Sequence, residues 1–369
     1  MTTRTAQGAL TLPREYYTSQ EIFDRESQKI FGEQWICVGR TSEIAQPGSY
    51  FLYELDDGIH QESIIITRDQ QGEAHAYYNV CRHRGTRICT AHQGQFSETI
   101  QCPYHAWTYS LNGELLGAPN MKDMADFRRE DYPLHEAALT EWEGFLMLNL
   151  SPTPTPFEEV YAPIIGRFEN WQLDRLQSAR CMTYDVQANW KLIFQNYNEC
   201  YHCPTVHPLL NRLTPYKNAV NDLEDGPFLG GPMSMDQPGS MTMSGQRCAP
   251  PLGNVAGDDL SAVYYYTMMP NFFLSLHPDY VLVHRLERRS VNETHVICDW
   301  LFDPEAIKQP GFTPDDAVEF WDMTNRQDWH VSELSQLGIS SRAYTPGPYA
   351  ELESVLAAFD REYLRLLQE

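Results

Sequence analysis

The stretch that decides the fold runs from residue 81 to residue 105 and reads CRHRGTRICTAHQGQFSETIQCPYH. Cys81 and His83 lie at its start, Cys102 and His105 at its end, and residues 84–101 separate the two pairs. Each pair supplies one thiolate and one imidazole. Two cysteines on one iron and two histidines on the other are the ligands of a mixed [2Fe–2S] cluster, so the stretch predicts a site for that cofactor.

A tetrahedral zinc site is the competing interpretation, because zinc also accepts two cysteines and two histidines. Zinc fingers, however, pair cysteine with cysteine and histidine with histidine along the chain. Here each pair mixes the two residue types. The order therefore favours a Rieske [2Fe–2S] cluster held by Cys81, His83, Cys102 and His105.

The surroundings of these two pairs predict a small all-β domain. Short β-rich runs separated by Pro-Gly and Asn-Gly turn signals occupy residues 49–55, 63–67, 74–80 and 145–150. The proline-rich stretch at residues 151–156 has neither helical nor strand periodicity and predicts a domain boundary. We therefore predict three segments: a helical part of the larger domain at residues 1–35, the Rieske domain at residues 36–155 and the larger domain at residues 156–369.

The larger domain is predicted to be α+β. A strand at residues 181–186 leads into a helix at residues 190–203, and a mobile loop rich in Gly, Pro, Met and Ser follows at residues 226–258. The order of the later elements predicts a curved antiparallel sheet with helices against it. These elements are strands at residues 262–269, 272–276, 280–286 and 295–302 and helices at residues 315–336 and 349–368.

The predicted helix at residues 190–203 carries a second set of metal ligands. Glu199 and His202 are three residues apart, so they share one face of a helix. Pro204 blocks continuation of the helix and allows the chain to turn His207 back toward His202. Two imidazoles and one carboxylate form the facial triad of oxygen-activating Fe(II) sites, which leaves positions open for O₂ and substrate.

The spacing alone leaves the carboxylate of this triad open. A zinc site built from Cys200, Cys203 and a histidine is the competing interpretation, but His202 lies between the two cysteines and points elsewhere. We therefore interpret Cys200 and Cys203 as packing residues. Four acids on the helix at residues 315–336 are candidates for the third ligand, namely Asp316, Asp322, Asp328 and Glu333.

The composition excludes several classes of partner. The 369 residues carry a formal net charge of −23, which repels phosphate backbones and anionic lipid, so we expect neither nucleic acid nor membrane as partner. Nine cysteines without a secretory signal segment predict reduced thiols in a cytoplasmic protein. Because no nucleotide-binding fingerprint occurs, electrons are expected to come from a separate reductase.

The motifs resemble those of the Rieske non-haem iron oxygenases of the ring-hydroxylating type, in their alpha subunit. The resemblance implies a Rieske domain inserted near the N-terminus and a helix-grip catalytic domain with a curved antiparallel sheet. It also implies that Glu199 links the two metal centres between neighbouring subunits of a homotrimer. The motifs are CRHRG at residues 81–85, CPYHAW at residues 102–107, NWK at residues 189–191 and ECYHCPTVHP at residues 199–208.

Residues 327–347 resemble the branch of this family that comprises choline, glycine betaine, stachydrine and carnitine oxygenases. That resemblance implies that Asp328 is the third ligand of a mononuclear Fe(II). Gln327 departs from the pattern, because many members have an acid there. The branch implies a monooxygenase that uses O₂, and electrons from an NAD(P)H-dependent flavin/iron–sulfur reductase, to hydroxylate or N-demethylate a small betaine-like substrate.

A quaternary ammonium substrate needs aromatic faces around it. Neighbouring strand residues point to opposite faces of a sheet, so only one set of the tyrosines at residues 264–266 can face the substrate. Two other functions compete with this hypothesis: ring hydroxylation of an aromatic substrate, and electron transfer by a Rieske protein without oxygenase activity. As candidates for the substrate pocket we choose Tyr264, Tyr266, Phe272 and Trp321.

Overall fold

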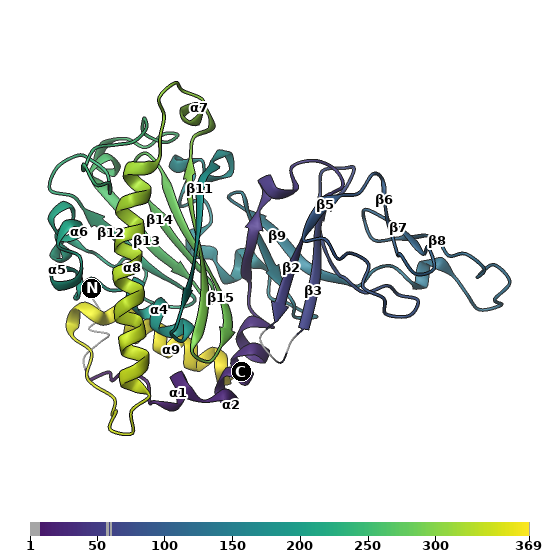
Figure 1. Ribbon diagram of the computed structural model, residues 1–369, viewed down its shortest axis with the longest axis horizontal. Helices are drawn as coiled ribbons and strands as arrows, with labels where there is room; N and C mark the ends of the chain where they lie inside the picture. Colours follow the sequence, from purple (N-terminus) through teal and green to yellow (C-terminus); the bar gives the residue numbers. More distant parts are fainter. Residues whose placement is uncertain (1–7, 57–58, 60, 369) are drawn as a thin grey trace. The chain divides into compact units, whose positions relative to one another are not determined.

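The computed structural model describes residues 8–56, 59 and 61–368. The chain divides into two compact units (Figure 1). Met1–Phe31 and Pro156–Glu369 form the larger unit, and Gly32–Thr155 form the smaller one. The larger unit therefore takes its first residues from the N-terminal end of the chain, and the smaller unit is inserted after them.

The smaller unit is built on a seven-stranded antiparallel sheet in the order β1-β10-β9-β4-β3-β2-β5. Ile64, Ile65 and Ile66 of β3 are all fully buried, so both faces of this strand are covered by other residues. A second antiparallel sheet contains β6, β7 and β8. The strands are β1 (Ile36–Arg40), β2 (Ser49–Asp56), β3 (Gln61–Arg68), β4 (Ala74–Tyr78), β5 (Gln93–Gln95), β6 (Thr99–Gln101), β7 (Thr108–Ser110), β8 (Leu115–Gly117), β9 (Glu136–Trp142) and β10 (Phe145–Asn149).

The larger unit contains a curled six-stranded antiparallel sheet in the order β11-β16-β15-β14-β13-β12. This sheet, with the helices that pack on it, confirms the predicted α+β class and the predicted curved antiparallel sheet. Its strands are β11 (Gln177–Val186), β12 (Phe228–Ser234), β13 (Ala262–Met268), β14 (Phe272–Leu276), β15 (Val281–Ser290) and β16 (Glu293–Phe302).

Strand β12 lies within residues 226–258, for which the sequence predicts a mobile loop, so that prediction is wrong for Phe228–Ser234. The glycines that suggested mobility serve close packing instead. A Cβ atom on Gly230 would lie 2.0 Å from the carbonyl oxygen of Tyr265, and one on Gly231 would lie 2.0 Å from that of Val220. Glycine is needed in β12 because neighbouring backbones approach closely.

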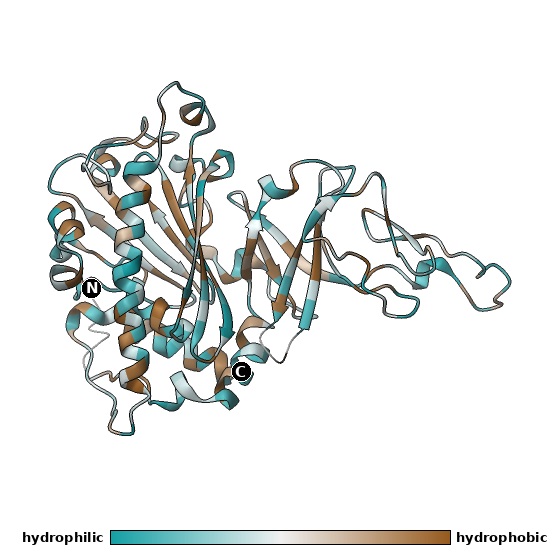
Figure 2. Ribbon diagram, viewed as in Figure 1, coloured by the Kyte–Doolittle hydropathy of each residue, from teal (hydrophilic) through white to brown (hydrophobic). Residues whose placement is uncertain are grey.

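Helix α8 packs against α4 and β11 in the larger unit. Figure 2 shows that much of α8 is hydrophilic, and its buried residues include Thr324, Asn325, Ser332 and Gln336. Buried polar side chains need hydrogen-bond partners. The buried polar face of α8 is therefore a candidate position for a functional site. No helix of the described residues is long and apolar enough to cross a membrane. The helices are α1 (Glu15–Thr18), α2 (Gln20–Glu26), α3 (Phe157–Val160), α4 (Trp190–Tyr197), α5 (Cys203–Val206), α6 (Pro208–Leu213), α7 (Pro304–Ile307), α8 (Asp315–Ile339) and α9 (Ser354–Gln368).

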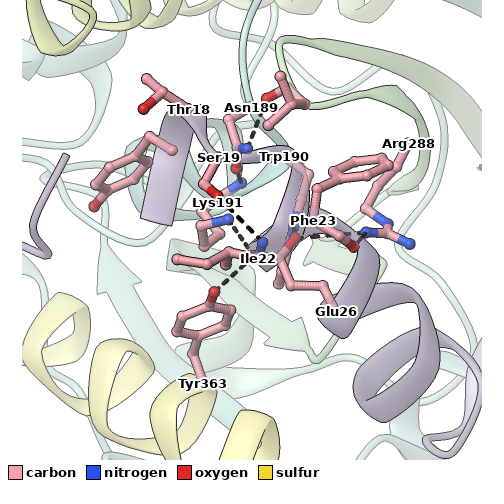
Figure 3. Close-up of polar contacts among 12 residues, drawn as sticks. Thr18, Ser19, Ile22, Phe23, Glu26, Asn189, Trp190, Lys191, Arg288 and Tyr363 are labelled. Carbon is pink, nitrogen blue, oxygen red and sulfur yellow. Dashed lines mark hydrogen bonds and ion pairs between the residues drawn. The ribbon is translucent and has the colours of Figure 1, made fainter. Parts of the chain in front are cut away.

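A buried charge cluster centred on Glu26 joins four segments of the larger unit (Figure 3). Glu26 Oε1 accepts hydrogen bonds from Lys191 Nζ at 2.5 Å and from Tyr363 Oη at 2.6 Å. Its Oε2 atom accepts a hydrogen bond from Trp190 Nε1 at 2.9 Å and lies 3.5 Å from Arg288 Nη1. The Glu26 and Lys191 side chains are fully buried, so these contacts replace the water that both charges lose on folding.

Helix α4 is held at both ends by further polar contacts. Asn189 caps its N-terminus by accepting a hydrogen bond from the Lys191 amide, while the Asn189 amide donates to Gln336 on α8. Gln195 donates to Asp360 on α9 at 2.7 Å. Burial raises the pKa of Asp360 to about 7. These contacts position the chain that leaves α4 toward the candidate site.

We expect Glu26→Gln to lower the free energy of unfolding by about 3–5 kcal/mol, because it removes the carboxylate that is paired with the buried Lys191. Denaturant unfolding of both proteins measures this difference. Glu21→Gln, on the exposed side of the same helix, is the matched control and should unfold like the wild type. Equal midpoints for Glu26→Gln and Glu21→Gln would contradict the role of the cluster.

Candidate functional site

Two loops of the smaller unit have the same backbone shape and carry the four predicted cluster ligands. In each, an amide four residues further along donates to the cysteine carbonyl: Gly85 to Cys81 at 3.0 Å and Ala106 to Cys102 at 3.1 Å. Gly85 and Ala106 both have positive φ, 73° and 56°. Glycine adopts this conformation readily, whereas alanine adopts it at a cost that is typical of functional loops.

The donor atoms of these loops lie close together. The ring centroids of His83 and His105 are 4.7 Å apart, and the Trp107 ring stacks on His83 at 4.8 Å. Cys81 and Cys102 are buried. His83 Nδ1 is buried and has no hydrogen-bond partner among the residues that the structure describes. Two buried thiols, two adjacent imidazoles and an unpartnered ring nitrogen fit the ligand set of a Rieske cluster.

Helix α4 ends at Tyr197, so the prediction of a helix that reaches residue 203 is wrong. Asn198 ends it by bonding its side-chain amide back to the Phe194 carbonyl. Glu199 and His202 therefore lie in the segment between α4 and α5 and do not share a helix face. Pro204 stands in the first turn of α5, where it has no lost hydrogen bond, and so begins a helix instead of ending one.

This segment brings two imidazoles to a carboxylate of α8. His207 Nε2 lies 3.1 Å from His202 Nε2 and 2.7 Å from Asp328 Oδ1, and His202 Nε2 lies 3.3 Å from Asp328 Oδ1. Ligands about 2.1 Å from a metal that meet at right angles lie about 3 Å apart. The separations of these three atoms, here called the ligand triangle, match those of three ligands on one face of an octahedral metal site. Among the four candidate acids, the structure brings Asp328 to the two histidines.

The outer nitrogen of each imidazole is bound to a carbonyl or carboxylate oxygen. His202 Nδ1 donates to Glu199 Oε1 at 2.5 Å, and His207 Nδ1 donates to Gln327 Oε1 at 2.7 Å. With a metal bound, both rings would carry their proton on Nδ1 and direct the Nε2 lone pair to the metal. Such partners fix the tautomer and the orientation of metal-binding histidines. Gln327, which the sequence marks only as a departure from the family pattern, thus has a positioning contact.

The electrostatics of the triangle favour a bound cation. Burial lowers the pKa of His202, but its hydrogen bonds with Asp328 and Glu199 outweigh burial and raise the pKa to about 10. Burial raises the pKa of Asp328, but contacts with His202 and His207 lower it below its ordinary value. The negative charge of Asp328, which raises the pKa of His202, would also stabilise a metal cation at this position. The donor set and its geometry fit a mononuclear iron.

Comparison with known families shows to which protein family this chain belongs. Residues 173–369 match the family of the ring hydroxylating alpha subunit (catalytic domain), and residues 34–128 match the Rieske [2Fe–2S] domain. This chain belongs to the Rieske-type ring-hydroxylating oxygenases. The oxygenase subunit carries a Rieske [2Fe–2S] cluster and a mononuclear iron, and it acts with a reductase, O₂ and a small-molecule substrate. A Rieske protein that only transfers electrons is thereby excluded.

Curated relatives cover most of this oxygenase subunit. It is 32% identical to the glycine betaine monooxygenase oxygenase subunit of Chromohalobacter salexigens, over 94% of this chain and 83% of that protein. It is 36% identical to the carnitine monooxygenase oxygenase subunit of Escherichia coli, over 55% of this chain and 53% of that protein. A solved quaternary ammonium Rieske monooxygenase superposes with a TM-score of 0.82 at 24% identity, covering 100% of this chain and 97% of that one, and so shares the fold.

A pocket adjoins His202, His207 and Asp328, and some of the residues that the sequence predicts for substrate binding line it. Trp321 lines it, whereas Tyr264, Tyr266 and Phe272 are not among its lining residues. Tyr265 lines it instead. Of the three consecutive tyrosines, Tyr265 therefore faces this pocket, because β13 turns that side chain toward it and the two neighbouring side chains to the opposite face. The face of β13 that turns inward depends on the segments that pack against the sheet, which come from distant parts of the chain.

Cys200 and Cys203 form a disulfide in the wall of the same pocket. The sequence predicts reduced thiols that pack against other residues, and the structure differs for this pair. The reason is the turn between α4 and α5, which brings the two Cα atoms to 5.0 Å, within the range that a disulfide requires.

We expect Gln327→Leu to lower the affinity for the mononuclear iron about 10–100-fold, because His207 loses the acceptor that orients its ring. Iron retained after dialysis against a chelator, measured beside the visible absorbance of the cluster, checks this. Gln327→Glu keeps an acceptor oxygen and should retain iron like the wild type. Equal iron retention in the leucine variant and the wild type would contradict the contact's importance.

Proposed function

We propose that this oxygenase subunit hydroxylates an N-methyl group of a small, betaine-like quaternary ammonium compound and so demethylates it. The observation that carries the proposal is the wall of the pocket beside Asp328. It combines the rings of Tyr197, Tyr265 and Trp321 with the carboxylate of Glu199, and none of its described lining residues is lysine or arginine. An ammonium over an aromatic face gains about 0.5–2 kcal/mol by cation–π attraction.

The named activities of the relatives support the same substrate class, since two of them are glycine betaine and carnitine monooxygenase oxygenase subunits. An aromatic substrate matches the wall less well, because a neutral ring makes no cation–π contact with these aromatic faces.

In this proposal, His202, His207 and Asp328 hold the mononuclear iron, and Cys81, His83, Cys102 and His105 hold the cluster. The iron site is supported by the short distances among His202 Nε2, His207 Nε2 and Asp328 Oδ1, which are 3.1, 2.7 and 3.3 Å. The two matching loops and the unpartnered His83 Nδ1 support the cluster assignment. When bound, the iron supplies the activation of O₂ and the cluster supplies single electrons.

We further propose that Glu199 connects the two kinds of centre between the subunits of a homotrimer. Glu199 and His202 line a second hollow of the larger unit, beside the pocket, together with Tyr349 and Glu353. In this arrangement His83 or His105 of one subunit docks in the hollow of the next and passes an electron through Glu199 to His202. A structure of a quaternary ammonium Rieske monooxygenase is described as giving insight into inter-subunit electron transfer in that protein.

The electron donor in this proposal is NAD(P)H, through a flavin/iron–sulfur reductase, which fits the cytoplasmic location that the sequence predicts. Each turnover consumes one O₂, two electrons and two protons. One oxygen atom enters a methyl C–H bond of the substrate and the other leaves as water. The resulting carbinolamine then breaks its C–N bond, which releases formaldehyde and leaves the demethylated amine.

Product analysis by mass spectrometry tests the proposed function. The iron-loaded subunit, purified without oxygen, is given NADH, a surrogate reductase, O₂ and a pool of glycine betaine, proline betaine, choline, carnitine and aromatic acids. We expect an oxygen-dependent product one methyl group lighter than an ammonium compound, together with formaldehyde. Turnover of an aromatic acid alone would overturn the ammonium substrate and leave the two metal centres in place.

Two variants on α8 control that experiment. Asp328→Ala should lose turnover and the mononuclear iron while keeping the cluster absorbance. Asp322→Asn changes a second acid of α8, which bonds to Tyr184 and Arg326, and should keep both. Equal iron content in the two variants would contradict the role of Asp328.

We expect Glu199→Gln to lose most turnover while both metals stay bound, because the amide cannot serve as a charged acceptor for two imidazoles. Iron content, cluster absorbance and the rate of product formation are measured on the same sample. Glu333→Gln, which changes an acid that accepts a hydrogen bond from the Gln187 amide, is the control. Wild-type turnover in Glu199→Gln would exclude the bridging role.

A further inference from the structure

The inner end of the substrate pocket is formed by one face of α8. Trp321, Thr324 and Asp328 are spaced by three and four residues and all line the pocket. With a rise of about 1.5 Å per residue, Trp321 lies about 10 Å along the helix axis from Asp328. Trp321 and Thr324 are buried, whereas Tyr201 and Leu352 on the same pocket wall are exposed. Trp321 therefore marks the inner end, and Tyr201 and Leu352 mark the mouth.

Tyr265 stands at this inner end, with its ring centroid 6.2 Å from that of Trp321. Its hydroxyl is buried and has no hydrogen-bond partner in the described parts of the chain. The hydroxyls of its neighbours Tyr264 and Tyr266, on the opposite face of β13, both bond to aspartate carboxylates. Of these three consecutive tyrosines, only the one that faces the pocket therefore lacks a partner.

A second unpartnered group lies behind Tyr265. The His277 ring centroid is 5.5 Å from that of Trp321 and 6.3 Å from that of Tyr265. Both ring nitrogens of His277 are buried and have no partner among the described residues. Burial keeps the pKa of His277 well below its ordinary value, so the ring is neutral and offers one donor and one acceptor. Buried polar groups are costly without partners, so two neighbouring ones indicate a binding site.

The position of the ligand residues gives a substrate its direction. His202, His207 and Asp328 lie on one part of the pocket wall, and Glu351 lies near the exposed mouth. In the proposed function the methyl groups of the ammonium have to lie beside these three ligand residues to be oxidised. The other end of the substrate then extends inward, where neither a lysine nor an arginine lines the described wall and Tyr265 offers a neutral donor.

We propose that Tyr265 determines specificity by donating its hydroxyl to an oxygen atom at the far end of the ammonium substrate, with the neutral His277 ring behind it. This inference rests on the proposed quaternary ammonium function and adds the group that the inner end of the pocket recognises. The shared chemistry is an oxygen acceptor, which a hydroxyl or a carboxylate can supply.

Steady-state kinetics of Tyr265→Phe test this proposal. The substrates are choline, with a hydroxyl, glycine betaine, with a carboxylate, and n-propyltrimethylammonium, with neither. Loss of one hydrogen bond to the substrate should raise KM about tenfold for the compound whose oxygen is recognised. The KM of n-propyltrimethylammonium and the kcat values should stay unchanged. Which of the first two compounds loses affinity distinguishes a hydroxyl from a carboxylate.

Tyr264→Phe is the matched control, because its hydroxyl bonds to Asp259 on the other face of β13, and it should leave all three KM values unchanged. Tyr265→Phe removes an unpartnered hydroxyl and should melt at or above the wild-type temperature. An unchanged KM for choline and glycine betaine, or an equal rise for all three compounds, overturns the hydrogen bond. A wild type that turns over no ammonium compound overturns the proposed function itself and this inference with it, which is a different result.

Discussion

The buried carboxylate of Glu26 is the constraint on which the larger unit depends. It comes from the N-terminal segment, before the inserted smaller unit, and it neutralises Lys191 of α4 and Arg288 of β15. A fully buried lysine without a carboxylate would be unfavourable, so the chain has to return to this point after the insertion. Because Lys191 lies in the first turn of α4, the same contact fixes the start of the segment that ends in the metal ligands.

A second set of hydrogen bonds, which are partly buried, orients the metal ligands at the other end of this segment. Glu199 and Gln327 hold the Nδ1 protons of the two imidazoles, and Asp328 faces their Nε2 atoms. The excess of negative charge around His202 raises its pKa to about 10, mainly because Asp328 and Glu199 outweigh the effect of burial. One arrangement thus orients the ligands and attracts the cation that they bind, and the adjoining pocket places a substrate beside them.

Much of the fold could be predicted from the sequence because its signals are local. Alternating apolar residues and turn signals gave the antiparallel strands, and helical periodicity gave α8 to within a few residues of its end. The end of α4 was wrong because Asn198 closes the helix before the periodicity stops. Strand β12 was wrong because its glycines resemble those of a loop, although they serve a close approach to Tyr265 and Val220.

The sequence by itself determined the chemistry of the donors: the order of cysteine and histidine in two pairs, and two histidines with nearby acids. Only the tertiary structure decided which acid of α8 lies beside His207 and that Tyr265, and not Tyr264 or Tyr266, faces the pocket. The physical reason is that the kind of ligand atom is a property of one residue. The face of a strand or helix that turns inward depends on the segments packed against it, which come from distant parts of the chain.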